Sequence, residues 1–259
     1  MLLRDKVAVV YGAGGAVGGT AARTFAREGA HVFLVGRTPA AIERVAGEIN
    51  AAGGRAESAV VDATDQEAVE AHLAALVAGT GRIDVSLNAT HPGAVMGIPL
   101  REMSMDDFTG PAQNALRLNF CTGTAAARRM ASAGSGVILT MSTSTTVLSG
   151  RDRRYHASGG FGAACAAVEE FTRALAGEVG PHGVRVVCLR PDALPETWGP
   201  HDEDAPDGPF RYMTDGTVLG RMPTLREVAD TAAFVASDRA SAMTGAIVNL
   251  TCGSNMNAS

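Results

Sequence analysis

The sequence has fewer basic than acidic residues, 22 against 27, and lysine is almost absent. Lys6 is the only lysine, so arginine supplies the other 21 of the 22 basic residues, and the formal net charge is −5. Proteins that bind nucleic acid usually present a basic surface to the phosphates. We therefore expect no nucleic-acid partner, and any site that needs a lysine away from the N-terminus has to do without one.

Paired cysteines, clustered histidines and long apolar runs are also missing. The four cysteines, Cys121, Cys165, Cys188 and Cys252, form no C-x-x-C pair and have apolar or small neighbours, which predicts reduced thiols. The six histidines are scattered, so we expect no metal site. No apolar run reaches the ~18 residues of a membrane span, and the first residues lack the apolar stretch of a signal peptide. We expect a cytoplasmic protein with no membrane partner.

What the sequence does contain is a regular alternation of apolar runs and amphipathic stretches. Seven strands are expected, at Val7–Tyr11, His31–Val35, Ala56–Val61, Ile83–Leu87, Gly136–Met141, Val184–Leu189 and Ala246–Leu250. Helices are expected from the first glycine turn to Glu28, at Pro39–Ala51, Gln66–Ala78, Ala112–Ala131 and Tyr155–Val179, and from a capping box at Thr224–Glu227 to Ala236. This order predicts an α/β fold of Rossmann type: one domain, residues 1–259, with a doubly wound parallel seven-stranded sheet in a three-layer α/β/α arrangement.

One long segment breaks the alternation. Arg190–Met222 contains five prolines and follows the sixth expected strand. Long irregular segments inside a compact domain are usually functional or disordered. We interpret it as a candidate substrate loop, with a mobile surface insertion as the alternative.

A glycine-rich turn joins the first strand to the first helix. Glycines at this place allow a tight turn and a close approach of the backbone to a pyrophosphate, and the helix N-terminus favours the anion. The alternative is a turn that only packs the helix on the strand. We favour a nicotinamide dinucleotide site, with the contacts supplied by Gly12, Gly14, Gly15, Val17 and Gly18.

The end of the second strand indicates which dinucleotide is bound. An acidic residue there holds the ribose hydroxyls of NAD, but this chain has Gly36 followed by Arg37. A guanidinium pairs well with a 2′-phosphate. NADP(H) is therefore the expected cofactor and NAD the less favoured one, unless Arg37 is simply a solvated charge.

Over nearly its whole length the chain resembles the short-chain dehydrogenase/reductases. The first turn reads Tyr11-Gly12-x-x-x-Ala16-x-Gly18, where that family has T-G-x-x-x-G-x-G. Further matches follow in order, and the resemblance implies a role for each. Asp62 resembles the aspartate near the adenine, Asn88 a remnant of N-N-A-G, Asn119 the asparagine that holds a proton-relay water, and Pro191 the start of P-G after the sixth strand.

The chain differs from the family pattern at the catalytic signature Y-x-x-x-K. The chain reads Tyr155-His156-Ala157-Ser158-Gly159, so glycine stands where the lysine is expected. On a helix these two positions share a face. In the family the lysine holds the nicotinamide ribose and lowers the phenol pKa from about 10. Without it the tyrosine is a poor base but still carries its proton, so reduction should suffer less than oxidation.

The resemblance implies an NADP(H)-dependent oxidoreductase that interconverts a carbonyl and an alcohol. Tyr155 would exchange the proton, Ser142 or Thr143 would orient the oxygen, and Asn119 would hold a water. The alternative is an NADP(H)-binding protein of this fold without efficient hydride transfer: a sensor, a partner subunit or an enzyme of altered chemistry. The small residues after Tyr155 predict close helix–helix approach, and with the resemblance they predict a homodimer or homotetramer.

Overall fold

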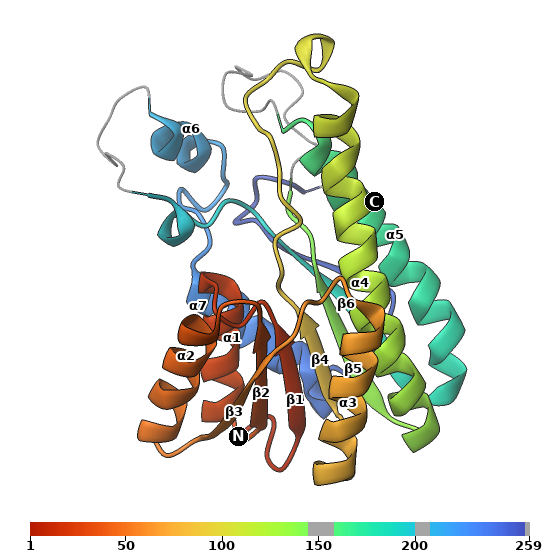
Figure 1. The fold of residues 1–259 in the computed structure, drawn as a ribbon. Coiled ribbons are helices and arrows are strands. Elements are labelled where there is room, and N and C mark those ends of the chain that lie inside the picture. Colours follow the sequence, from red (N-terminus) through yellow and green to blue (C-terminus); the bar gives the residue numbers. More distant parts are fainter. Residues whose placement is uncertain (145–157, 200–207, 257–259) are drawn as a thin grey trace.

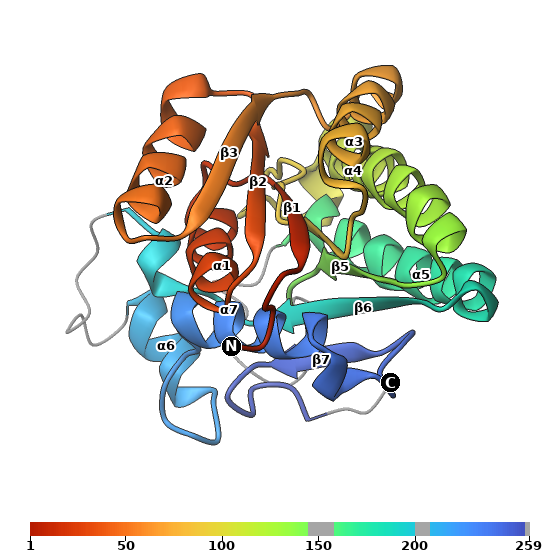
Figure 2. The same cartoon turned by 90° about the horizontal axis from the view of Figure 1, so that it is seen from below.

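The computed structural model describes residues 1–144, 158–199 and 208–256. Its centre is a parallel sheet in the order β3-β2-β1-β4-β5-β6-β7, as Figures 1 and 2 show. The strands are β1 (Val7–Tyr11), β2 (His31–Gly36), β3 (Arg55–Val60), β4 (Val85–Asn88), β5 (Gly136–Met141), β6 (Val184–Pro191) and β7 (Ile247–Leu250). The predicted doubly wound seven-stranded sheet is confirmed, with the strand order reversing between β1 and β4.

Helices cover both faces of the sheet. They are α1 (Ala16–Arg27), α2 (Pro39–Ala51), α3 (Gln66–Thr80), α4 (Met105–Ala133), α5 (Gly160–Val179), α6 (Pro209–Asp215) and α7 (Leu225–Ala236). One apolar core joins α1, α2 and α7 to the sheet, and a second joins α3, α4 and α5 to the opposite face. Figure 2 shows the two groups on either side of the strands. The predicted three layers are confirmed.

Two predicted helix starts are wrong. The helix expected to begin at Ala112 begins at Met105, after the N-cap Ser104, and runs on through Pro111. The helix expected from Tyr155 begins at Gly160. Gly159 has a φ of 54°, in the left-handed region, and stands before the helix as its N-cap. Gly159 is therefore not part of α5. Tyr155 lies outside the described residues.

The glycines at the start of α5 let it approach α4 closely. A Cβ at Gly160 would lie 1.9 Å from the Phe108 carbonyl oxygen, so no larger residue fits there. At Gly123 of α4, the nearest atoms to such a Cβ would belong to the Phe171 ring, at 3.3 Å. The predicted close helix approach is thus met inside a single chain, which removes part of the argument for an oligomer.

The segment Arg190–Met222 is less irregular than predicted. β6 extends to Pro191, and a 3-10 helix (Pro195–Thr197) and helix α6 follow; residues 200–207 lie outside the described part. Beyond the segment, the capping box at Thr224 and Glu227 opens α7 as predicted. All four cysteines are free, as predicted. In the described part of the chain, no helix is long and apolar enough to span a bilayer.

Candidate active site

A cavity of about 1580 Å³ lies where the strands end. Its walls come from the glycine turn, the ends of β2, β4, β5 and β6, the middle of α4, the start of α5 and the region around α6. Ligands in doubly wound sheets bind at the carboxyl ends of the strands beside the switch point. Most of the predicted site residues therefore face one space.

The glycine turn is shaped by two close backbone contacts. Gly12 has a φ of 77°, and a Cβ there would lie 2.7 Å from the Ala89 carbonyl oxygen. A Cβ at Gly18 would lie 2.4 Å from the Gly12 oxygen, so the turn folds directly against α1. At Gly15 the same test meets only one atom within contact range, at 3.4 Å. The turn is therefore packed tightly against backbone at Gly12 and Gly18. Its cavity side is formed by Gly12, Gly14, Gly15 and Val17.

This shape fits a dinucleotide pyrophosphate. The first backbone N–H groups of an α-helix have no partner within the helix, and those of α1 begin at Ala16 on the cavity wall. The first turn of α1 carries no acidic side chain that would repel an anion. Gly18 is buried behind the turn and shapes it without lining the cavity.

The rim beyond β2 and β3 carries charges of both signs. Arg37 is exposed on the cavity wall, and no carboxylate of the described chain pairs with its guanidinium. Asp62 accepts hydrogen bonds from the Thr64 N–H and hydroxyl at 2.9 and 2.8 Å. These bonds, with the nearby Arg37 and Arg117 guanidiniums, hold the pKa of Asp62 below its ordinary value. The rim thus offers a fixed carboxylate and an unpaired guanidinium.

Asn88 does not reach the cavity with its side chain. Its Nδ2 donates to Thr122 Oγ1 at 3.2 Å, and its Oδ1 accepts from the Thr90 N–H at 3.1 Å. The side chain is buried and joins β4 to α4. Asn88 therefore shapes the loop that leaves β4, while its neighbours Ala89 and Thr90 line the cavity.

Asn119, in the middle of α4, is among the residues that line the cavity, and one of its side-chain atoms is unsatisfied. Its Nδ2 donates to the Ala115 carbonyl oxygen at 2.9 Å, but its buried Oδ1 has no partner among the described residues. An unpaired buried acceptor costs about 1–3 kcal/mol. A water or ligand donor at this point would remove that cost, which fits a bound water.

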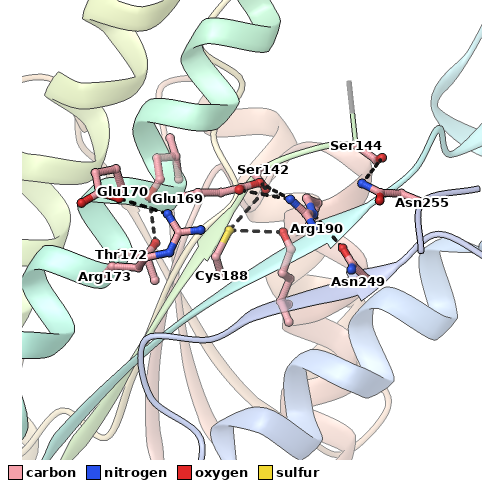
Figure 3. Close-up of polar contacts among 12 residues, drawn as sticks. Ser142, Ser144, Glu169, Glu170, Thr172, Arg173, Cys188, Arg190, Asn249 and Asn255 are labelled. Carbon is pink, nitrogen blue, oxygen red and sulfur yellow. Dashed lines mark hydrogen bonds and ion pairs between the residues drawn. The ribbon is translucent and has the colours of Figure 1, made fainter. Parts of the chain in front are cut away.

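Ser142 belongs to a buried polar network at the back of the cavity (Figure 3). Its hydroxyl donates to Glu169 Oε1 at 2.8 Å and accepts from the Cys188 thiol at 3.4 Å. Arg190 pairs with Glu169 at 3.2 Å and donates to Asn249 Oδ1 at 2.6 Å. The network joins β5, α5, β6 and β7.

The network separates the two candidate hydroxyls. The single hydrogen of the Ser142 hydroxyl is given to Glu169, so it is not available to a substrate oxygen. Thr143 is the next residue on the cavity wall. Of the two candidate hydroxyls, that of Thr143 is the one that remains.

Sequence reasoning missed two residues at the start of α5. Phe161 and Cys165 stand one turn apart, and both line the cavity. Burial raises the pKa of the Cys165 thiol to about 12, so the thiol stays protonated. Phe161-x-x-x-Cys165 repeats the Y-x-x-x-K spacing, and that repeat was the available signal. His91, which follows β4, also lines the cavity and was not singled out.

The remaining walls are mostly apolar. Leu194, Trp198, Pro209 and Met213 come from the predicted substrate loop, and Met96 comes from the segment after β4. Pro191 lines the cavity as β6 ends. In the part of the chain that the structure describes, no three His, Cys, Asp or Glu side chains are grouped to hold a metal.

Comparison with known proteins places this fold and site in a family. A family model described as enoyl-(acyl carrier protein) reductase matches residues 12–255. The short-chain reductase protein NovJ of Streptomyces niveus is 31% identical over 263 residues, covering 96% of this chain and 94% of NovJ. Galactitol 2-dehydrogenase of Cereibacter sphaeroides is 32% identical and covers 95% of this chain and 93% of its own.

Solved structures share the same architecture. A dehydrogenase/reductase from Sinorhizobium meliloti 1021 superposes with a TM-score of 0.82 at 26% identity, covering 98% of this chain and 96% of that one. A structure described as NAD+-bound xylitol dehydrogenase gives 0.83 at 23% identity, covering 98% and 100%; at that identity the likeness concerns the fold.

The chain belongs to the short-chain dehydrogenase/reductase family. The members compared with it are dehydrogenases and reductases, and the family uses a nicotinamide cofactor to interconvert carbonyl and alcohol groups. That membership classes the protein as an oxidoreductase.

Proposed function

We propose that the protein is an NADP(H)-dependent oxidoreductase that acts mainly as a carbonyl reductase on a small-molecule substrate. The observation that carries the cofactor choice is Arg37, which is exposed at the cavity rim beside Gly36 and forms no ion pair with a carboxylate among the described residues. A guanidinium so placed suits a 2′-phosphate. Gly36 supplies no carboxylate for the NAD ribose.

The chain's own residues have separate tasks in this proposal. The open turn at Gly12, Gly14, Gly15 and Val17 holds the pyrophosphate, and Asp62 lies toward the adenine. When bound, the nicotinamide supplies or accepts a hydride. Thr143 donates a hydrogen bond to the substrate oxygen, and Asn119 Oδ1 holds a water.

The preferred direction follows from the missing lysine. The chain has one lysine, Lys6, which pairs with Asp238 at 3.2 Å. Lys6 precedes β1, so it lies at the amino ends of the strands, while the cavity lies at their carboxyl ends. We propose Tyr155 as the proton-exchanging group. A phenol with an unassisted pKa of about 10 is ~0.1% ionised at pH 7, so it gives a proton more readily than it takes one.

Arg37 provides the test of the cofactor. Arg37→Ala should raise the Kd for NADPH by about tenfold or more, since a charge-assisted hydrogen bond contributes about 1.5–3 kcal/mol. The Kd for NADH should stay within about twofold, because NADH has no 2′-phosphate. Both values come from titrations of nucleotide fluorescence. An equal change for the two cofactors would contradict the assignment.

A second candidate function is an NADP(H)-binding protein without efficient hydride transfer. One observation favours it: the two cavity-lining residues one turn apart on α5 are Phe161 and Cys165. A phenyl ring exchanges no proton, and a thiol with a pKa near 12 is not ionised at neutral pH. Such a protein would bind NADPH and leave it unoxidised.

We further propose that the protein works in the cytoplasm as a homodimer or homotetramer. Its free cysteines suit a reducing compartment. The outward sides of α4 and α5 support self-association: Leu116 and Phe120 are exposed on α4, and Ala163 and Ala166 on α5. Apolar surface of this kind is typical of subunit contacts.

A further inference from the structure

We propose that His91 holds the substrate carbonyl oxygen through its Nε2–H group. The proposal deepens the function proposed above and rests on it, because it names a residue that contacts the substrate of the same cavity. Phe161, which lines the cavity from α5, has no polar atom to offer a substrate oxygen. His91 lines the same cavity and is in a position to supply a hydrogen-bond donor in addition to Thr143.

The first argument is the tautomer. The Gly93 N–H donates to His91 Nδ1 at 3.0 Å, so Nδ1 acts as an acceptor and carries no hydrogen. A neutral imidazole with an accepting Nδ1 carries its hydrogen on Nε2. The loop after β4 thus fixes His91 as a hydrogen-bond donor through the other ring nitrogen.

The second argument is the orientation of the ring. The imidazole stacks on the Phe161 ring, with centroids 5.5 Å apart and planes at 19°. The Phe161 ring and the Gly93 bond hold the imidazole on two sides. Both His91 and Phe161 line the cavity. The side chain is therefore positioned before any ligand arrives, which is what a donor to a reacting oxygen requires.

The third argument is the position of His91 relative to Thr143. Strands β4 and β5 are paired neighbours, with Leu87 beside Leu139. His91 and Thr143 each lie four residues beyond that pair, past the carboxyl ends of the two strands. Two donors from adjacent strand ends can therefore approach one oxygen, with Phe161 as the apolar wall between α5 and the substrate.

Two variants test the donor. His91→Phe keeps an aromatic ring for the stack and removes the N–H, while His91→Gln keeps an N–H on a flexible chain. We expect His91→Phe to lower kcat/KM for NADPH-dependent reduction of cyclohexanone or 2,3-butanedione by about 100-fold, in the range of a lost oxyanion donor. The Kd for NADPH should not change, and His91→Gln should retain more activity than His91→Phe. Activity of His91→Phe within twofold of wild type overturns the proposal.

A measurement without turnover separates this proposal from the proposed function. Protein labelled with 15N-histidine is saturated with NADP+ and titrated with cyclohexanone, and the Nε2–H signal of His91 is followed by NMR. A saturable shift of that signal supports the donor role even if wild type oxidises no NADPH, in which case only the oxidoreductase proposal fails. Turnover in wild type with no shift overturns the His91 proposal alone. Neither turnover nor a shift overturns both.

Discussion

At the scale of single residues, the site contains a buried ion pair between Glu169 and Arg190. Their side chains are only 11% and 9% exposed. Taking two charges out of water is unfavourable, and the attraction between them offsets that cost only when both charged groups make further hydrogen bonds. Here Ser142 donates to Glu169, and Arg190 donates to Asn249. The pair fixes β5, β6 and β7 against α5 behind the cavity.

The pair makes a prediction about stability. Arg190→Met leaves Glu169 buried without a partner, so the free energy of unfolding should fall by about 3–5 kcal/mol. The double variant Glu169→Gln with Arg190→Met removes both charges and should recover most of that loss. Urea denaturation at one fixed protein concentration measures both. A single variant as stable as the double would show that the charge of Glu169 is not confined as described.

The same network shows what residue-level reading of the sequence could and could not supply. The open glycine turn and the Gly36-Arg37 pair follow from local spacing, and both lie on the cavity wall. The choice between Ser142 and Thr143 depends on Glu169, which is 27 residues further along the chain. No local sequence pattern predicts that bond, so the sequence could not decide between the Ser142 and Thr143 hydroxyls.

At the scale of elements, α4 and α5 determine the shape of the site. They lie side by side in Figure 1, and α4 carries Asn119 while α5 carries Phe161 and Cys165. Their separation is set where Gly160 touches the Phe108 carbonyl. A change of spacing at that point would move both walls of the cavity.

Two glycines of α5 test this contact. Gly160→Ala puts a Cβ against backbone and should cost about 3 kcal/mol, the upper range for overpacking. Gly177→Ala, on the same helix, meets no atom within 4 Å and should stabilise the protein by up to about 1 kcal/mol. Thermal unfolding distinguishes them. Equal effects of the two substitutions would mean that the close approach at Gly160 does not set the helix spacing.

The strands β1, β2 and β6 were predictable because each is a largely apolar run buried on both faces of the sheet. Helix starts were harder. The helix expected from Ala112 begins upstream at Met105, because Ser104 caps its N-terminus, and Pro111 lies inside it. The start of α5 was misplaced because Gly159 has a left-handed φ and stands before the helix as its N-cap. A backbone conformation of this kind cannot be derived from apolar spacing.

At the scale of the whole molecule, the outward sides of α4 and α5 predict self-association. Light scattering at micromolar concentration should give the mass of a dimer or tetramer. Phe120→Glu puts a charge on this surface and should shift the mass toward the monomer. Val60→Glu is the matched control, since Val60 is also exposed but lies on β3 at the edge of the sheet. A monomeric wild type would contradict the prediction.

The whole fold also explains why one cavity borders both the glycine turn and the ends of β4 and β5. The strand order reverses between β1 and β4, so the loops after these strands diverge and leave a space above the sheet edge. The glycine turn after β1 borders one side of that space, and His91 after β4 and Thr143 after β5 border the other. The account therefore requires that a bound NADPH be oxidised by a carbonyl compound in the same cavity.

The most direct measurement of that requirement is the absorbance of protein-bound NADPH at 340 nm after mixing with a panel of ketones and diketones. NADH is run in parallel, and the alcohol products are tested with NADP+ at the same pH. The account predicts that at least one carbonyl compound oxidises NADPH, faster than NADH and faster than its alcohol reduces NADP+. NADPH that binds tightly and stays unoxidised with every carbonyl compound would contradict it.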